Sequence, residues 1–227
     1  MMETNKIIQG DCLEVLKTLP DESVDFILAD YPFNCQDGRK DYFEFVKKTA
    51  DEFYRVLKLN GNLLVLNNPI NIFKTSSFYH QFNYRNGIAL IRKGSLRPAW
   101  MFGFQHNYAL ILYKGNSKKE KWNGATTNHD KSFLTDVIEY QNGFRGKGKM
   151  WHPQAIPLEL TKTFVSVLSD HGDVVLDPFL GSGTTAVACV ETGRNFIGIE
   201  LKPEYVKIAH KRLRPYLEQT KLTEVTE

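Results

Sequence analysis

The sequence has few cysteines, no long apolar run and no paired metal ligands, and each absence excludes a class of protein. The 3 cysteines among 227 residues are scattered without Cys-x-x-Cys spacing, which argues against a disulfide framework or a zinc knuckle and fits a reducing cytoplasm. No apolar run approaches the roughly 18–20 residues of a transmembrane helix, and the first residues, MMETNKIIQGD, do not resemble a signal peptide. The 6 histidines show no paired-ligand spacing. We therefore expect a cytoplasmic protein with no membrane span and no metal site.

Positive charge is concentrated in the middle of the chain. Residues 71–149 hold 13 Lys and Arg against 4 Asp and Glu, whereas residues 1–70 hold 8 against 12 and residues 150–227 hold 8 against 10. A basic segment of this kind indicates a polyanionic partner, although a solvated basic surface has the same composition. The hydrophobic content of 42% suffices for one core. We expect one domain built from residues 1–70 and 150–227, with residues 71–149 inserted.

Short apolar runs alternate with segments of helical periodicity on both sides of this basic middle. The predicted strands are Val24–Ala29, Asn62–Leu66, Gly87–Arg92, Tyr108–Tyr113, Asp173–Leu176 and Asn195–Glu200. The predicted helices are Asp41–Lys58, Pro157–Leu168, Thr184–Glu191 and Pro203–Leu217, and Lys114–Lys149 is predicted to be rich in loops. The alternation predicts an α/β fold with a doubly wound, Rossmann-like sheet and helices on both faces.

The stretch DPFLGSGTT, residues 177–185, has the parts of a nucleoside-binding turn. A predicted strand ends at Asp177, the glycines at positions 181 and 183 let a ligand approach the backbone, and a helix begins at Thr184. The next predicted strand ends at Glu200, where a carboxylate can accept both hydroxyls of a ribose.

Three ligands could use such a turn, and a plain helix-capping turn is the structural alternative. The spacing Gly181-x-Gly183-x-x-Ala186 fits a loose dinucleotide fingerprint. ATP bound in a P-loop is disfavoured, because no Lys precedes the Ser or Thr. S-adenosylmethionine carries a positive sulfonium and an amino group but no phosphate, so acids suit its pocket. Asp177, inside the turn itself, favours this cationic ligand.

These residues resemble the cofactor motif of the amino-group DNA methyltransferases, which is written DPFxGSGTT. The stretch Asp30-Tyr31-Pro32-Phe33 is similar to the family's catalytic motif, [DNS]-P-P-[YFW], with Tyr31 in place of the first proline. The catalytic motif precedes the basic middle and the cofactor motif comes last, which resembles the circularly permuted β-type members. The resemblance spans about residues 7–67 and 151–213 and implies a methyltransferase sheet with a basic target-recognition insert.

The resemblance implies S-adenosyl-L-methionine as the cofactor and assigns residues to it. Gly10-Asp11-Cys12 looks like the segment that contacts the adenine end of the cofactor. His152–Pro157 resembles the HPTQKP element that closes the methionine end, with Gln154-Ala155-Ile156 in place of TQK. The implied cofactor-binding residues are Asp11, Cys12, His152, Asp177, Phe179, Gly181, Ser182, Gly183, Thr184, Glu200 and Leu201.

The resemblance also implies a catalytic role for Asp30, Tyr31, Pro32 and Phe33. Asp30 and the Tyr31 carbonyl would accept the two N–H hydrogens of a base amino group, so that its nitrogen can turn its lone pair toward the methyl group. Direct in-line transfer would follow, with positioning and electrostatics as the main catalytic effects. Phe33 would stack on the base, which must leave the duplex to be reached. Tyr31 supplies the carbonyl but does not restrict φ as proline does.

Asp at the first position of the catalytic motif favours adenine N6, because family members that act on cytosine N4 more often carry Ser there. Cytosine N4 in DNA and an RNA substrate are alternatives within the enzyme class. A nucleic-acid-binding protein that holds the cofactor but has lost catalytic turnover is an alternative from another class. The departures from the family motifs at Tyr31 and Gln154–Ile156 would indicate such a protein. An NAD-dependent oxidoreductase is a more distant one. Methylation of cytosine carbon 5 is disfavoured, because it needs a Pro-Cys pair and none occurs.

Residues 71–149 are expected to be the target-recognition region, with cations that neutralise the phosphates of a DNA duplex. The expected nucleic-acid-binding residues are Arg92, Lys93, Arg97, Lys118, Lys119, Lys121, Arg145, Lys147 and Lys149. No helix-turn-helix or zinc-finger pattern occurs, so the recognition sequence cannot be read. The resemblance suggests a homodimer, an associated restriction endonuclease and a bacterial, archaeal or phage context as hypotheses to test.

Overall fold

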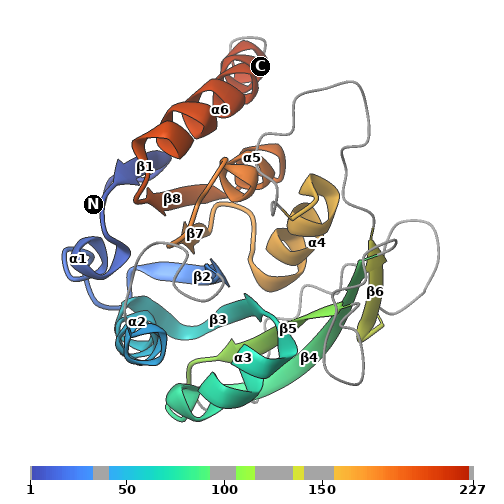
Figure 1. Cartoon of the computed structure of the whole chain (residues 1–227). Coiled ribbons are helices and arrows are strands. Elements are labelled where there is room, and N and C mark those ends of the chain that lie inside the picture. Colours follow the sequence, from blue (N-terminus) through green and yellow to red (C-terminus); the bar gives the residue numbers. More distant parts are fainter. Residues whose placement is uncertain (1, 33–40, 93–105, 116–134, 141–155, 225–227) are drawn as a thin grey trace.

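The computed structural model describes residues 2–32, 41–92, 106–115, 135–140 and 156–224, and for Arg92 and residues 219–224 only the backbone (Figure 1). These residues build an 8-stranded sheet with the order β1-β8-β7-β2-β3-β5-β4-β6. The strands are β1 Lys6–Gln9, β2 Val24–Asp30, β3 Leu57–Asn67, β4 Asn83–Arg92, β5 His106–Tyr113, β6 Val137–Tyr140, β7 Val174–Asp177 and β8 Asn195–Glu200. The predicted α/β class is confirmed.

The direction of the strands divides the sheet into two parts. The strands β1, β8, β7, β2 and β3 run parallel to one another. On the other side of β3, strand β5 is antiparallel to both β3 and β4, and β6 is parallel to β4. In Figure 1 the β5–β4–β6 part lies to one side of the parallel strands. The described part of residues 71–149 therefore continues the same sheet.

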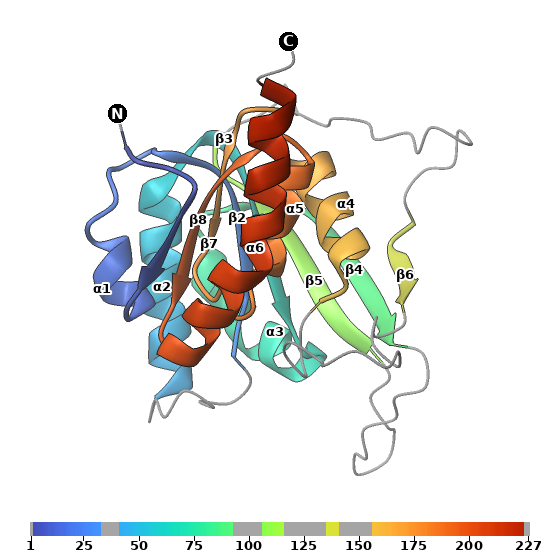
Figure 2. The same cartoon turned by 90° about the horizontal axis from the view of Figure 1, so that it is seen from above.

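Helices cover both faces of the sheet, as Figure 2 shows with α1 and α2 on one side and α4 and α5 on the other. The helices are α1 Cys12–Leu16, α2 Tyr42–Val56, α3 Pro69–Thr75, α4 Leu158–Leu168, α5 Thr184–Glu191 and α6 Pro203–Glu224, with a short 3-10 helix over Ser76–Tyr79. One core contains side chains of α1, α2 and α3 and the other those of α4, α5 and α6. Within the described residues no helix is long and apolar enough to cross a membrane.

Helix α2 shows how the sequence produces these layers. Its apolar residues recur at helical spacing, and Phe45, Val46, Phe53 and Val56 are buried against the sheet. Asp41 caps its first turn, because the side chain accepts a hydrogen bond from the backbone N–H of Glu44 at 3.1 Å. The packing of this face, more than helix propensity, holds α2 in place.

The predicted elements are confirmed except at several boundaries. The predicted helix over Asp41–Lys58 ends at Val56, because Leu57 already pairs with Val24 in the sheet. The residue before the predicted strand, Gly61, lies inside β3, where a Cβ would be 2.8 Å from the carbonyl oxygen of Asp25. Helix α6 continues past the predicted end at Leu217.

Among the described residues, five elements were not predicted, one of them the 3-10 helix over Ser76–Tyr79. Strand β1, helix α1 and helix α3 are short and carry little periodicity. Strand β6 lies within the stretch predicted to be rich in loops, where it pairs with β4 at the edge of the sheet. Tertiary pairing, which sequence periodicity does not report, stabilises this strand.

Candidate functional site

Three carboxylates end neighbouring strands at one edge of the sheet. Asp30 ends β2, Asp177 ends β7 and Glu200 ends β8, and these strands are adjacent and parallel. The carboxyl ends of parallel strands are where open α/β sheets gather their ligands. The fold therefore brings together three acids that are far apart in the sequence.

The first two of these acids have raised pKa values. Burial raises the pKa of Asp30 to about 8, and the nearby charge of Asp177 adds to the effect. Burial likewise raises the pKa of Asp177 to about 7, with a further contribution from Glu200, while hydrogen bonds from Thr185 and Phe179 oppose the rise. Asp30 keeps partial contact with solvent and Asp177 is buried. Such a cluster favours a cationic ligand, which would let the acids ionise.

The glycine turn lies beside these acids and is tied to them through its backbone. Gly181 and Gly183 adopt positive φ angles of 54° and 83°, which side-chain-bearing residues rarely adopt. The N–H of Gly181 donates to Oε2 of Glu200 at 2.8 Å, and the N–H of Phe179 donates to Oδ1 of Asp177 at 2.9 Å. A Cβ on Gly183 would lie 3.0 Å from the Cβ of Ala209 on α6. The predicted turn between a strand and a helix is therefore present, and it uses backbone conformations that favour glycine.

Glu200 is more constrained than the sequence suggested. Besides the bond from Gly181, its Oε1 accepts the N–H of Lys202 at 2.8 Å. Each carboxylate oxygen can still accept another hydrogen bond, so a ribose hydroxyl remains compatible with this arrangement. Leu201, the next residue, is 42% exposed.

Arg212 on α6 donates hydrogen bonds to the hydroxyls of Ser182 and Thr184 in the turn. This residue was not identified from the sequence. Its Nη1 donates to Oγ1 of Thr184 at 2.8 Å and lies 3.3 Å from Oγ of Ser182. Burial lowers the pKa of the Arg212 guanidinium. These two hydroxyls therefore face α6 and help to fix the turn, although the sequence assigned them directly to the cofactor. No local signal marks Arg212, which lies 28 residues from Thr184.

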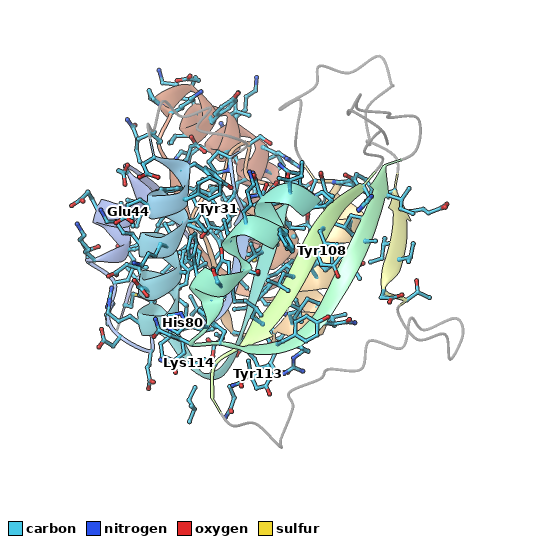
Figure 3. The ribbon with its side chains drawn as sticks, turned by 60° about the horizontal axis from the view of Figure 1, so that its bottom comes forward. Tyr31, Glu44, His80, Tyr108, Tyr113 and Lys114 are labelled. Atoms are coloured by element: carbon cyan, nitrogen blue, oxygen red, sulfur yellow. The ribbon has the colours of Figure 1, made fainter. Side chains whose placement is uncertain are left out.

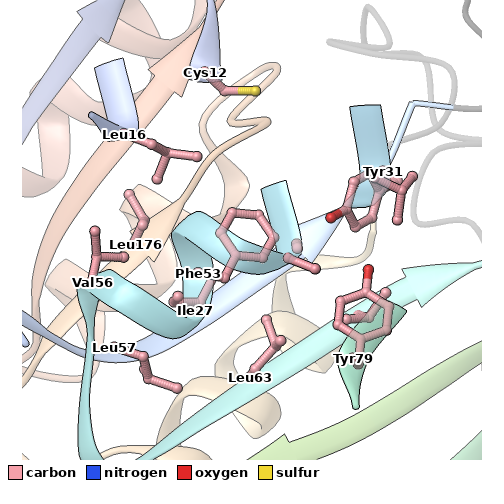
Figure 4. Close-up of a cluster of buried hydrophobic side chains, with 14 of the residues drawn as sticks. Cys12, Leu16, Ile27, Tyr31, Phe53, Val56, Leu57, Leu63, Tyr79 and Leu176 are labelled. Atoms are coloured by element: carbon pink, nitrogen blue, oxygen red, sulfur yellow. The ribbon is translucent and has the colours of Figure 1, made fainter. Parts of the chain in front are cut away.

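The segment at Asp11 reaches the same edge of the sheet. Strand β1 pairs with β8, and the N–H of Gly10 donates to the carbonyl oxygen of Glu200 at 3.0 Å. Asp11 caps α1 through a bond to its Oδ1 from the N–H of Leu13 at 2.9 Å. The Cys12 side chain points into the core and is 4% exposed (Figure 4), so only its backbone can face a ligand.

Tyr31 follows Asp30 and has its side chain in the core. Its N–H donates to the carbonyl oxygen of Leu66 at 3.3 Å, which extends the pairing of β2 with β3 by one residue. Its ring is 1% exposed, and its hydroxyl lies 2.6 Å from Oγ1 of Thr49. Pro32 is partly buried.

The remaining predicted site residues lie outside the described part of the chain. These are Phe33, His152, Lys93, Arg97, Lys118, Lys119, Lys121, Arg145, Lys147 and Lys149. The backbone of Arg92 ends β4 at the same edge of the sheet as Asp30, since Leu66 and Ile88 both pair with Ala109. Among the described residues no group of three or more His, Cys, Asp or Glu side chains could hold a metal ion.

Part of the positive charge in the middle segment serves the fold. Lys114 is 7% exposed, and its Nζ donates to the carbonyl oxygen of Leu57 at 2.9 Å and pairs with Glu22 at 3.0 Å. The guanidinium of Arg85 lies 5.0 Å from the centre of the Tyr113 ring. Figure 3 shows Tyr113 and Lys114 at the end of β5 opposite to Tyr108. The register places these two cations at the edge away from the acids.

Comparison with known proteins shows that the chain is similar to DNA methyltransferases. A family model described as DNA methylase matches residues 24–211. The chain is 30% identical to DNA adenine methyltransferase YhdJ of Escherichia coli strain K12, over 93% of this chain and 83% of that protein. It is 32% identical to type II methyltransferase M.BamHI of Bacillus amyloliquefaciens, over 88% of this chain. The chain spans only 55% of the length of M.BamHI.

Solved structures with a similar fold cover most of the chain. The complex of M1.HpyAVI with S-adenosylmethionine superposes with a TM-score of 0.70 and 26% identity, over 92% of this chain and 98% of that chain. The cytosine-N4-specific PvuII DNA methyltransferase has a TM-score of 0.79 at 21% identity, over 92% of this chain and 86% of that chain, which shows a shared fold.

Proposed function

Since the chain belongs to the N6/N4 family of DNA methylases, we propose that it transfers a methyl group from S-adenosyl-L-methionine to an exocyclic amino nitrogen of a DNA base, with adenine N6 as the acceptor. The observation that carries the proposal is the meeting of Asp30, Asp177 and Glu200 at the carboxyl edge of the sheet, beside a glycine turn. The cofactor motif and the catalytic motif are thereby brought to one site.

The residues at this edge fit the cofactor by their chemistry. S-adenosylmethionine is cationic and carries no phosphate, and the described residues offer it acids. Glu200 and Asp11 would hold its nucleoside part and Asp177 its positively charged part, with Phe179, Gly181, Gly183 and the backbone of Cys12 against it. Ser182 and Thr184 would act through the shape of the turn, because their hydroxyls bond to Arg212. When bound, the cofactor supplies the electrophilic methyl group.

Asp30 would orient the target amino group. With a pKa of about 8, much of this carboxyl is protonated at neutral pH, and a protonated carboxyl accepts hydrogen bonds poorly. A positive charge bound nearby favours the ionised form. We propose that cofactor binding ionises Asp30 and so prepares it to accept an N–H of the base. The Tyr31 carbonyl would accept the second N–H hydrogen, and Pro32 and Phe33 would complete the base-binding loop.

Adenine is preferred over cytosine because an Asp stands at the first position of the catalytic motif, and YhdJ, a DNA adenine methyltransferase, is among the relatives. The basic residues predicted within 71–149, among them Arg92 at the end of β4, would bind the phosphates of the duplex from which the target base is flipped. We retain His152 as a cofactor contact and Leu201 as a residue beside the ribose. We likewise retain the division into a catalytic part and a target-recognition insert.

Similarity to a type II methyltransferase, M.BamHI, supports a restriction–modification context with an associated endonuclease, in a bacterial, archaeal or phage cytoplasm. A homodimer is a further hypothesis that sedimentation of the pure protein, with and without DNA, would test.

The decisive experiment is methyl transfer from labelled S-adenosylmethionine to mixed-sequence duplex DNA, followed by digestion to nucleosides and chromatography. Label in N6-methyladenine is expected, and label in N4-methylcytosine would replace adenine by cytosine. Matched RNA serves as the competing substrate. Asp21→Ala is a suitable control for Asp30→Ala, because Asp21 is an exposed acid before the opposite end of β2. Absence of label from wild-type protein that binds both cofactor and DNA would refute turnover.

A further inference from the structure

Tyr31 stands where the family motif has a proline, and its side chain makes contacts that a proline cannot make. The ring lies among four other aromatic rings, with its centre 6.5 Å from that of Tyr42, 6.2 Å from Phe45, 6.3 Å from Phe53 and 4.8 Å from Phe179. The first three belong to α2. Phe179 belongs to the glycine turn.

The hydroxyl of Tyr31 is also anchored to α2. It lies 2.6 Å from Oγ1 of Thr49, which in turn lies 3.0 Å from the carbonyl oxygen of Phe45 and 2.9 Å from that of Val46. Thr49 has a single hydroxyl hydrogen, and a carbonyl can only accept. Thr49 therefore donates to the helix, and Tyr31 donates to Thr49. Figure 4 shows the hydroxyl of Tyr79 pointing toward Tyr31 from below.

We propose that Tyr31 is a positioning residue whose side chain joins the segment Asp30–Pro32 to the cofactor turn. The inference rests on the proposed function, since it assigns Asp30 and the Tyr31 carbonyl to the base. In the family motif, proline restricts φ after the acid. In this chain the backbone at Tyr31 is held instead by the N–H bond to Leu66 and by the buried ring.

The contact with Phe179 gives the ring a second role. The N–H of Phe179 donates to Oδ1 of Asp177, so a displacement of the Phe179 ring moves the backbone that holds this carboxylate. Tyr31 follows Asp30 directly. One pair of rings, 4.8 Å apart, therefore connects the acid of the base site with the acid of the cofactor turn. A displacement of Asp30–Pro32 or of the cofactor turn would therefore be felt by the other through this ring contact.

A double-mutant cycle of Tyr31→Leu and Phe179→Leu tests the connection. Each single change is expected to lower kcat by about 10-fold or more and to weaken cofactor affinity by about 3-fold, because small displacements of reacting groups reduce rates strongly. If the rings act as one unit, the double variant should be no worse than the more impaired single variant. Losses in kcat and affinity that simply multiply would overturn the proposal.

Three further variants separate positioning from core packing. Phe164→Leu removes a similarly buried ring from the opposite core, and is expected to lower stability while leaving kcat per folded molecule unchanged. Tyr31→Phe keeps the ring contact and should restore cofactor affinity to within about twofold of wild type. Tyr31→Pro, which installs the family residue, should remain less active than wild type because it loses both the ring and the N–H bond to Leu66, whereas Tyr31→Leu loses the ring alone. Wild-type activity in Tyr31→Pro would refute the side-chain anchor.

The outcome is distinguishable from failure of the proposed function. If wild-type protein transfers no methyl group to any base, the function fails. The cycle on cofactor affinity, measured by titration calorimetry with S-adenosylmethionine, still tests the ring connection. Coupled losses of affinity support it, and independent losses refute it.

Discussion

The buried carboxyl of Asp30 makes a prediction that joins stability to activity. Its pKa is about 8 in the folded protein against an ordinary value of 3.8. A raised pKa in an acid means that the folded state binds more protons than the unfolded state between these two values. The stability that Asp30 contributes therefore falls as pH rises through this window and is lowest above pH 8. The substitution Asp30→Asn replaces the carboxyl by a neutral group of the same shape and removes this pH dependence.

The size of the effect follows from the interval between pH 6 and pH 8. Each pH unit below the pKa of about 8 changes the free energy of unfolding by at most about 1.4 kcal/mol. Over two units, Asp30 can therefore lower the free energy of unfolding by nearly 3 kcal/mol at most. Because Asp30 keeps partial contact with solvent, we expect about 1–2 kcal/mol after discounting for screening. Between pH 6 and pH 9, the free energy of unfolding of wild type should therefore fall by this much more than that of Asp30→Asn. This difference corresponds to roughly 2–8 °C in Tm.

Urea denaturation of both proteins without cofactor, at pH 6 and at pH 9, measures this difference directly. The same variant should lose at least about 100-fold in methyl transfer, as expected for removal of a preorganised group, and keep cofactor affinity within a few-fold. Asp21→Asn, at an exposed acid, is the matched control and should change neither quantity. Parallel pH profiles for wild type and Asp30→Asn would show that Asp30 is not desolvated. Retained activity would remove Asp30 from the catalytic site.

The other predictions concern the cofactor turn. Affinity for S-adenosylmethionine should rise with pH between about 6.5 and 8.5, as the acids at 30 and 177 ionise, and should rise less for S-adenosylhomocysteine, which lacks the sulfonium charge; calorimetry at several pH values decides, and equal pH dependence for both would refute the charge argument. Asp177→Ala should weaken cofactor binding, and unchanged affinity would remove this acid from the pocket. Arg212→Met should weaken cofactor binding about 3- to 10-fold by freeing the turn, whereas Arg214→Met, on the exposed side of α6, should have no effect. Gly183→Ala should lower stability by about 1–2 kcal/mol more than Gly172→Ala, because the two glycines share a φ of about +82° but only Gly183 lies against Ala209; equal losses in chemical denaturation would contradict this packing argument.

The sequence determined much of the fold and the composition of the site. Helix α5 and strand β8 have the bounds that apolar periodicity predicted, β2 extends one residue beyond its predicted end, and β7 begins and ends one residue later than predicted. The stretch DPFLGSGTT indicated a turn that needs glycine, because few residues other than glycine adopt the positive φ angles found at 181 and 183. Such local signals are readable because they depend on neighbouring residues alone.

Only the tertiary structure decided how these parts act on one another. The burial of Asp30 and its placement beside Asp177, which together raise the pKa of Asp30, depend on the order of β2 and β7 in the sheet. The bond from Arg212 to Thr184 and the contact of Tyr31 with Thr49 and Phe179 join residues that share no motif. The same holds for Lys114, which the charge count included among the 13 cations of residues 71–149 and which is buried and bonded to Leu57 and Glu22. Residue types are a property of the chain, whereas desolvation and contact depend on which strands and helices become neighbours.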